Sequence, residues 1–316
     1  MSLPSYSCQT PVAFFVFNRP ELTRKVFDRI REMRPKRLLV IADGPRGTKL
    51  GEAQSCKQVR EIATTVDWPC IVETNFAPEN MGCRGRLTSG LKWVFEQTEE
   101  AIILEDDVLP DPTFFRFCDE MLEHYRDDPR VSMITGFNIV QDRTATPDSY
   151  YFSGLTHIWG WATWRRAWKT YDEQITSWPA VKASGLMAEM FPQADHREHW
   201  TRIFDEMYNG TGPNTWDLQW VYTNLIHNAL SIAPGVNLVD NIGFGPNATH
   251  TIFEADAPRL PVHPLQFPLR HPPAMVPLRQ LDLLDQDRSG WGKLSLLMRI
   301  RRKILRQWFA RRGASR

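Results

Sequence analysis

Residues 12–22 read VAFFVFNRPEL, an apolar run that stops abruptly at Asn18-Arg19-Pro20. Six consecutive hydrophobic residues suit a buried strand, because a membrane span needs about 20. Proline favours the first turn of a helix, and apolar residues then recur at helical spacing: Leu22, Val26, Ile30 and Met33. The stretch therefore predicts a strand, a short turn and an amphipathic helix.

The same alternation continues over the first 130 residues. Further strands are expected at 37–42, 70–74 and 101–104, each followed by polar residues that include Asp43, Asn75 and the acidic Glu105-Asp106-Asp107. Alternating strands and helices predict an α/β fold with a Rossmann-like, mostly parallel sheet. Ligands of such sheets bind at the carboxyl ends of the strands, so these polar residues mark the expected site. A later strand at 131–135 and a helix over 217–230 are expected to complete the same domain.

Composition excludes several classes of protein. The 316 residues are 42% hydrophobic and 24% charged, which excludes wholesale disorder. The net charge of +1 gives no overall attraction to nucleic acid, and no nucleic-acid partner is expected. The N-terminus lacks the basic region of a signal peptide, and no run is long enough to cross a bilayer. Five dispersed cysteines without a CxxC pair argue against a disulfide framework and indicate a reducing, cytoplasmic location.

The acidic triplet Glu105-Asp106-Asp107 has two interpretations. Three adjacent carboxylates repel one another unless a cation lies among them, and Mg²⁺ or Mn²⁺ prefers such oxygen ligands. Alternatively, the triplet is a solvated loop before a helix that Asp111-Pro112 begins. Its position after a strand favours the metal.

Four motifs in fixed order carry a resemblance to a known group: FNRPE at 17–21, ADGPRG at 42–47, ENMGCRGRLTSGL at 79–91 and ILEDDVLP at 103–110. Over residues 11–252 the chain resembles the nucleotide-diphospho-sugar glycosyltransferases of GT-A fold. The likeness is to family-2-like bacterial enzymes and to the inverting N-acetylglucosaminyltransferase I group. It implies a metal-dependent inverting transferase that moves a sugar from a UDP-sugar, such as UDP-GlcNAc, to a hydroxyl of a surface glycan or glycolipid.

The resemblance implies roles for the residues that follow the first two strands. Asn18 and Arg19 lie where the fold usually contacts the nucleotide base, and Asp43 lies where a carboxylate usually bonds the uracil or ribose. A plain turn role for Asp43 in Asp-Gly-Pro remains equally open. Of the triplet, Glu105 and Asp106 are implied to face the donor's ribose or sugar, and Asp107 to ligate the metal.

The glycine-rich segment that contains Asn80 and Gly82 precedes a helix expected at 87–95. In the resembling families this segment approaches the diphosphate, and Arg84 and Arg86 would bind it, since arginines and helix N-termini favour phosphate. The alternative is a pair of solvated arginines on a helix surface.

The motif NTWDLQW places Asp217 at an expected helix start between two tryptophans. The resemblance implies that Asp217 is the catalytic base that deprotonates the acceptor hydroxyl. Asp217 would otherwise simply cap the helix, and Asp205 and Glu206 are the fallback candidates.

Two further segments are candidates for the pocket. In 152–164, Ser153 and His157 could bond sugar hydroxyls, and Gly160 and Trp161 are assigned to the donor or acceptor pocket. The helical spacing of Trp161, Trp164 and Trp168 equally suits a core stripe. In the glycine-punctuated loop 241–251, His250 is a candidate ligand of the metal or diphosphate, against the alternative of a structural histidine.

The C-terminal part divides into two segments after a domain at 1–256. Residues 257–288 begin with seven prolines in 257–278, which suit an extended connection, and 289–316 predict a basic amphipathic helix. Residues 293–316 contain nine Lys/Arg and no Asp or Glu, which leaves 29 basic and 37 acidic residues elsewhere. This tail suits the anionic inner face of a plasma membrane, where lipid-linked acceptors reside, or an acidic neighbour.

Two rival functions remain. A nucleotidyltransferase that makes a nucleotide-sugar shares the fold, but FNRPE lacks the glycine-rich basic loop expected after its first strand. A catalytically silent glycan-binding or nucleotide-sugar-binding module is the other. The complete acidic triplet and Asp217 argue against that module.

Overall fold

The computed structural model describes residues 6–144, 146–243 and 260–290. The strands are β1 (Val12–Val16), β2 (Arg37–Ala42), β3 (Ile71–Phe76), β4 (Glu100–Glu105), β5 (Val108–Pro110), β6 (Val131–Thr135), β7 (Tyr150–Ser153), β8 (Trp161–Trp164), β9 (Leu230–Pro234) and β10 (Val239–Asn241). The helices are α1 (Pro20–Met33), α2 (Glu52–Thr64), α3 (Gly82–Gln97), α4 (Pro112–His124), α5 (Arg165–Trp168), α6 (Trp178–Ala183), α7 (Leu186–Met190), α8 (Ala194–Tyr208), α9 (Asp217–Ile226) and α10 (Arg279–Arg288).

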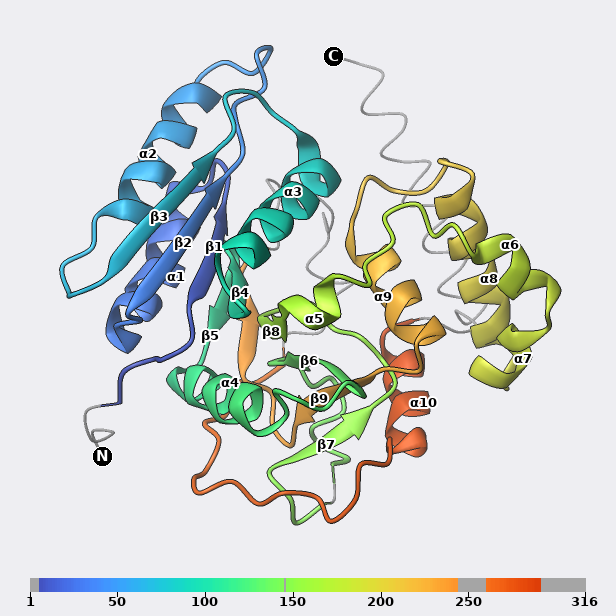
Figure 1. The fold of residues 1–316 in the computed structure, drawn as a ribbon. Coiled ribbons are helices and arrows are strands. Elements are labelled where there is room, and N and C mark those ends of the chain that lie inside the picture. The colour runs from blue at the N-terminus through green and yellow to red at the C-terminus, as the bar shows by residue number, and fades with distance from the viewer. Residues whose placement is uncertain (1–5, 145, 244–259, 291–316) are drawn as a thin grey trace.

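The described chain forms an α/β fold around an eight-stranded sheet of order β3-β2-β1-β4-β8-β6-β9-β7 (Figure 1). Strands β1 to β4 are parallel to one another, and β6 and β9 share their direction. Only β7 and β8 run the other way among these eight strands of the described chain. The sheet is therefore mostly parallel and Rossmann-like, as the sequence predicts.

Helices cover both faces of the sheet, because the central strands are apolar on both sides. Side chains of α1, α2 and α4 pack on one face, where Phe14, Phe27 and Phe114 are fully buried. Side chains of α3, α5 and α9 pack on the other, where Leu91 and Trp220 are fully buried. This arrangement leaves the carboxyl ends of β1 and β4 as the edge from which the connecting loops emerge.

A third cluster of apolar side chains holds α6, α7 and α8 against α9. Its largest members are aromatic, with Trp178, Trp200 and Phe204 each about 1% exposed. These helices lie beside α9, away from strands β1 to β3 (Figure 1). They form a helical unit with its own small core.

The structure corrects four expected elements. The helix expected at 87–95 is α3 and already begins at Gly82, so Arg84 and Arg86 lie within the helix and not before it. The helix expected over 217–230 ends at Ile226, because Asn228 adopts a left-handed backbone (φ 49°), and Leu230 instead begins β9. The tryptophan segment is not a helical stripe, since Trp161–Trp164 is strand β8 and only the next four residues are helical. The third strand is Ile71–Phe76 rather than 70–74.

Residues 260–278 are extended and pass along β7, the strand at the edge of the sheet opposite β3, before α10 begins. Ser149 and Arg270 exchange hydrogen bonds, and Phe152 forms an isolated bridge with Pro277. Within the described ranges no helix is both long and apolar enough to span a membrane. The expected basic tail at 293–316 lies outside the described residues.

Candidate functional site at the carboxyl edge of β1 and β4

The pairing of β1 with β4 brings two of the sequence motifs together. The two strands are parallel and Phe15 lies opposite Glu105, so the residues that follow each strand meet at one edge. The Phe17 N–H donates to Asp106 Oδ2 at 3.2 Å. The register therefore places the turn 17–19 against the acidic triplet.

Arg19 is the cation among these carboxylates. Its guanidinium pairs with Asp106 and, at 3.0 Å, with Asp107 Oδ2. The exposed fractions of the side chains are 19% for Arg19, 3% for Asp106 and 18% for Asp107. Burial alone would lower the pKa of Arg19, but Asp106 and Asp107 raise it, so the guanidinium stays charged.

Crowding of the triplet changes the acidity of its first two members. Burial raises the pKa of Glu105 to about 8, and the charges of Asp107 and Asp106 add to this effect. Burial also raises the pKa of Asp106 to about 6, although Arg19 acts in the opposite direction. The site therefore holds more negative charge than its surroundings stabilise, a property typical of sites that bind cations or transfer protons.

A short two-stranded ribbon fixes Asp107 from the other side. Strand β10 pairs with β5, and the Ile242 N–H donates to the Asp107 carbonyl at 2.8 Å. Gly243 follows so closely that a Cβ there would lie 2.7 Å from Asp107 Cβ and 2.8 Å from its Cγ. Only glycine fits this approach without moving the carboxylate. The sequence gives no signal for this contact beyond a glycine-rich loop.

Asp111, and not the triplet, caps the following helix. Its carboxylate accepts a hydrogen bond from the Thr113 N–H at 2.8 Å, and Pro112 is the first residue of α4. The cap that the solvated-loop interpretation requires is thus present. It uses none of the three triplet carboxylates.

Asp217 lies in the same region, at the start of α9. It is half-buried, and the N-cap is Trp216, which makes no side-chain capping bond. Asp217 instead accepts a hydrogen bond from the Thr215 hydroxyl. Its side chain is therefore not the helix cap that the alternative interpretation expected.

The pKa of Cys83, at the start of α3, is affected by the charges of several carboxylates. The pKa of the Cys83 thiol is raised to about 12 by burial and by four charges, those of Glu105, Asp217, Asp107 and Asp43. The charge of Asp217 also contributes to the raised pKa of Glu105. Carboxylates at or after the ends of β2 and β4 and at the start of α9, far apart in the sequence, thus all influence the thiol at the start of α3.

Asp43 organises the loop before α3. Its Oδ1 accepts from the N–H groups of Gly44 (2.8 Å) and Met81 (2.9 Å), and its Oδ2 accepts from Asn80 Nδ2 (2.9 Å). These bonds hold residues 79–82 over the end of β2. Asp43 therefore has the turn role that the sequence left open. Its role at a nucleotide base or ribose stays a prediction.

Asn18 and Arg84 are both engaged by the protein. Asn18 Nδ2 donates to Glu52 Oε1 at 2.8 Å, and Arg46 pairs with the same carboxylate. Arg84 Nε donates to the Thr215 carbonyl at 3.0 Å, which ties α3 to the loop before Asp217. Glu52 was not among the residues that sequence reasoning selected, because its partners lie on other loops.

Arg86, Gly160 and Trp161 lie beneath the edge. Arg86 is buried and donates to Asn75, and burial lowers its pKa. Gly160 is buried, with Val239 close to the position that a Cβ would take. Trp161 is 1% exposed and stacks on Trp216 at 5.4 Å between ring centroids. All three residues are thus engaged within the protein, Arg86 by hydrogen bonds and Gly160 and Trp161 by packing.

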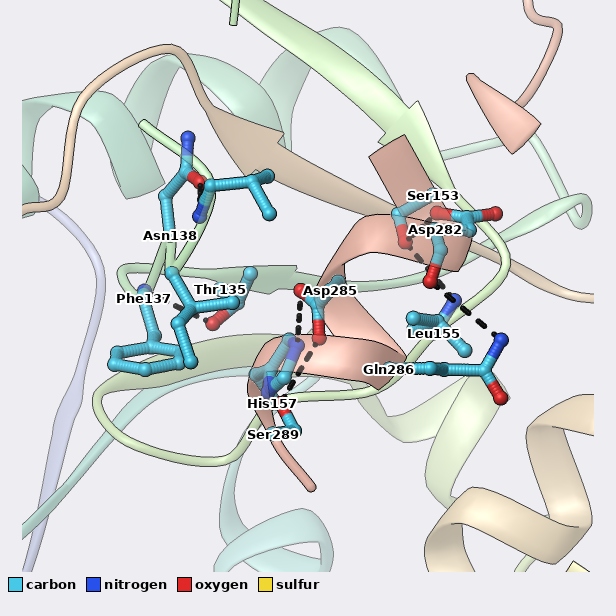
Figure 2. Close-up of polar contacts among 12 residues, drawn as sticks. Thr135, Phe137, Asn138, Ser153, Leu155, His157, Asp282, Asp285, Gln286 and Ser289 are labelled. Atoms are coloured by element: carbon cyan, nitrogen blue, oxygen red, sulfur yellow. Dashed lines mark hydrogen bonds and ion pairs between the residues drawn. The ribbon is translucent and has the colours of Figure 1, made fainter. Parts of the chain in front are cut away.

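Two polar side chains at and after the end of β7, those of Ser153 and His157, bond residues of α10 (Figure 2). Ser153 Oγ donates to Asp282 at 2.6 Å, and His157 Nε2 lies 2.8 Å from Asp285 Oδ2. Both carboxylates are buried. From the sequence, both side chains are expected to be free to bond sugar hydroxyls. In the structure they instead bond carboxylates of α10.

The fallback bases and His250 are not part of the described cluster. Asp205 bonds Trp178 Nε1 and pairs with Lys182, and Glu206 pairs with Arg202, all within the helical unit. His250 lies outside the described residues.

In the part of the chain that the structure describes, the site could hold the expected metal only through one protein ligand, with the other ligands supplied from outside the protein. Within residues 6–144, 146–243 and 260–290, no three His, Cys, Asp or Glu side chains are grouped as a metal cage. Asp107 offers a single, partly exposed carboxylate. Such a ligand suits Mg²⁺ or Mn²⁺ ions that take their remaining ligands from substrate phosphates and water.

Comparison with known proteins gives no family. No family model matches the sequence, and no curated protein is significantly similar to it. Function is therefore inferred from the residues and their arrangement.

Proposed function

We propose that this protein is a metal-dependent inverting glycosyltransferase of GT-A type that transfers a sugar from a UDP-sugar, such as UDP-GlcNAc, to a hydroxyl. One observation carries the proposal: residues 81–84 at the start of α3 bond both Asp43 and the loop before Asp217, and the charges of Glu105, Asp107 and Asp217 all act on Cys83 there. A donor, a metal and an acceptor base need this combination of carboxylates at the carboxyl edge of the sheet.

The donor side of the proposed site uses residues at or after the ends of β1, β2 and β4. Asn18, Arg19 and Asp43 border the place proposed for the nucleoside, and Glu105 and Asp106 border that for the ribose and sugar. Asp107 would hold the metal, which supplies electrostatic neutralisation of the leaving diphosphate. Arg84 positions the loop that carries Asp217 through its bond to the Thr215 carbonyl.

Asp217 is the proposed base. Its carboxylate removes the proton of the acceptor hydroxyl while the hydroxyl oxygen forms a bond to the anomeric carbon from the face opposite the diphosphate. The bond between that carbon and the diphosphate oxygen breaks, and its electron pair leaves with UDP. The proton stays on Asp217 until it passes to solvent, so the configuration inverts without a covalent protein intermediate.

The acceptor proposed is a surface glycan or a lipid-linked glycan at the cytoplasmic face of a membrane. The basic residues of 293–316 support this choice through their attraction to anionic lipid. The protein would then be cytoplasmic and peripheral to that membrane.

The decisive experiment measures UDP released from a panel of UDP-sugars, with and without Mn²⁺. Wild type is expected to hydrolyse one donor slowly in the presence of metal, and Asp107→Ala to lose this activity by at least about 100-fold. Asp217→Asn is expected to bind the donor normally yet fail to transfer its sugar to an acceptor. Asp205→Asn is the matched control, since it removes a carboxylate from the helical unit and should retain transfer.

Three results would contradict the proposal. If neither UDP nor any UDP-sugar binds under any condition, the proposed donor site is wrong. This result would favour a glycan-binding module without catalytic activity. Inactivity of Asp205→Asn together with full activity of Asp217→Asn would move the base to the helical unit. Release of pyrophosphate from a nucleoside triphosphate and a sugar phosphate would instead identify a nucleotidyltransferase.

A further inference from the structure

Arg19 already pairs with Asp107, the carboxylate that the proposed metal would use, and with its neighbour Asp106. Its guanidinium bridges Asp106 and Asp107, with 3.0 Å between Nη1 and Asp107 Oδ2. Asp106 is nearly inaccessible, whereas Arg19 and Asp107 are each nearly one-fifth exposed. The exposed side of this ion pair therefore contains Asp107 and the outer part of the guanidinium.

The backbone of Arg19 is fixed, but its side chain has an alternative partner within the proposed site. The Arg19 carbonyl accepts bonds from Thr23 N (2.9 Å) and Thr23 Oγ1 (2.8 Å), which anchor it at the start of α1. Asp106 also accepts the Phe17 N–H, so it retains a partner when the guanidinium leaves. A diphosphate offers arginine two anionic oxygens in the bidentate geometry that guanidinium favours.

A divalent cation and the guanidinium compete for Asp107. Mg²⁺ and ions of its size contact carboxylate oxygens at about 2.1 Å, so an ion on Asp107 would lie within a few ångströms of the positive Arg19. Repulsion between like charges at such a separation is strong even with partial solvent screening. Metal and Arg19 in its present position are therefore poorly compatible.

We infer that Arg19 makes metal binding at Asp107 conditional on the donor, as a built-in counterion that releases Asp107 only when a nucleoside diphosphate binds. This inference rests on the proposed function. It makes Arg19 a positioning residue that sets the order of binding, with diphosphate and metal entering together and neither favoured alone.

The primary test measures Mn²⁺ binding to the full chain without nucleotide, by the loss of the free-ion electron paramagnetic resonance signal. Arg19→Met removes the charge and keeps much of the side-chain volume. It is expected to bind Mn²⁺ at least about tenfold more tightly than wild type. Arg19→Lys keeps the charge and should bind Mn²⁺ as weakly as wild type.

A second measurement follows the coupling between the two ligands by calorimetry. In wild type, saturating Mn²⁺ is expected to tighten UDP binding at least about tenfold, and UDP must tighten Mn²⁺ binding by the same factor. In Arg19→Met the factor should be several-fold smaller than in wild type, because the metal no longer needs the diphosphate to displace a cation and only its direct bonds to the phosphates still couple the two ligands. If Arg19 had a purely structural role, Arg19→Met would weaken the binding of Mn²⁺ and of UDP together and leave the coupling between them unchanged.

Two controls keep the test independent of misfolding and of net charge. Arg29→Met removes an arginine of α1, the helix that follows Arg19. Arg29 bonds the Pro110 carbonyl at 2.7 Å, and its loss should leave Mn²⁺ binding unchanged. Because Arg19→Met leaves the buried Asp106 without its cation, the substitution is repeated with Asp106→Asn and compared with Asp106→Asn alone. The same tightening of Mn²⁺ binding is expected in this neutralised background.

The outcomes separate this inference from the proposed function. If UDP with Mn²⁺ binds wild type but Arg19→Met binds Mn²⁺ alone no more tightly than wild type, the conditional role is wrong and the transferase site stands. The same conclusion follows if Arg29→Met tightens Mn²⁺ binding equally. If UDP binds none of the proteins with or without Mn²⁺, the proposed function itself fails.

Discussion

Gly243 shows how a single missing side chain can position a charged one. A Cβ at 243 would fall within 2.8 Å of Asp107 Cβ and Cγ, so Gly243→Ala must push the carboxylate aside. We expect at least a tenfold loss of metal-dependent UDP release with little change in thermal stability, since small displacements of catalytic groups are costly. Gly47→Ala is the control, because a Cβ at 47 meets nothing within 4 Å. Equal activity of the two variants would show that Asp107 tolerates displacement.

Glu52 predicts a specific dependence of stability on pH. Its hydrogen bond with Arg46, helped by the Arg46 N–H and Asn18, lowers its pKa from 4.5 to about 2. A lowered pKa in the folded state stabilises the protein above pH 4.5, and this stabilisation is lost as pH falls from about 4.5 to 2. Arg46 is 41% exposed, so solvent screening limits the effect of Glu52→Gln at pH 7 to about 1–2 kcal/mol.

Urea unfolding of wild type and Glu52→Gln between pH 7 and pH 3 measures this difference. The free energies of unfolding of the two proteins should converge as pH falls. A constant difference across this range would contradict the lowered pKa of Glu52.

Helix α10 holds the end of the described chain against two parts of the fold. Asp282 bonds Ser153 Oγ and the Gly154 N–H, and Gln286 Oε1 accepts from Trp200 Nε1 of the helical unit at 3.2 Å. Figure 2 shows Asp282 and Asp285 directed at the segment after β7. The helix therefore connects the sheet edge with α8.

Asp282→Ala is expected to lower the free energy of unfolding by about 1–3 kcal/mol, because it leaves buried donors without an acceptor. Gln280→Ala changes an exposed residue of the same helix and should cost less than about 0.5 kcal/mol. Urea titrations monitored by tryptophan fluorescence provide both values. Equal values for the two variants would mean that α10 contributes no stability through Asp282.

Elements defined by local pattern could be predicted, and those defined by distant partners could not. The apolar run 37–42 is bounded by polar turns, and β2 has these limits. Trp161 and Trp164 have a spacing that fits a helix as well as a strand, and pairing with β4 and β6 decides for the strand. A shared site for Asp107 and Asp217 is implied only by the family resemblance and stays a prediction, whereas the bridge that Arg19 makes between Asp106 and Asp107 depends on the register of β1 against β4.

At the scale of the whole molecule, the basic charge of 293–316 predicts salt-dependent attachment to lipid. We expect the full chain to sediment with vesicles that contain phosphatidylglycerol and to be released by high salt, because each basic residue near an anionic surface contributes about 1 kcal/mol. A chain of residues 1–290 should keep its UDP release and lose this binding. Vesicles of phosphatidylcholine alone are the control. Absence of binding by the full chain would favour an acidic protein neighbour for the tail.

The ribbon of β5 and β10 has a consequence for the synthesis of the protein. Val108 pairs with Asn241, so the support of Asp107 comes from a segment that the ribosome makes more than 130 residues later. A nascent chain that ends before β10 holds the strands β1 to β4 but lacks Ile242 and Gly243, which fix the proposed metal ligand. Under the proposed function, the growing polypeptide would therefore lack a positioned metal ligand until residues 239–243 have been translated.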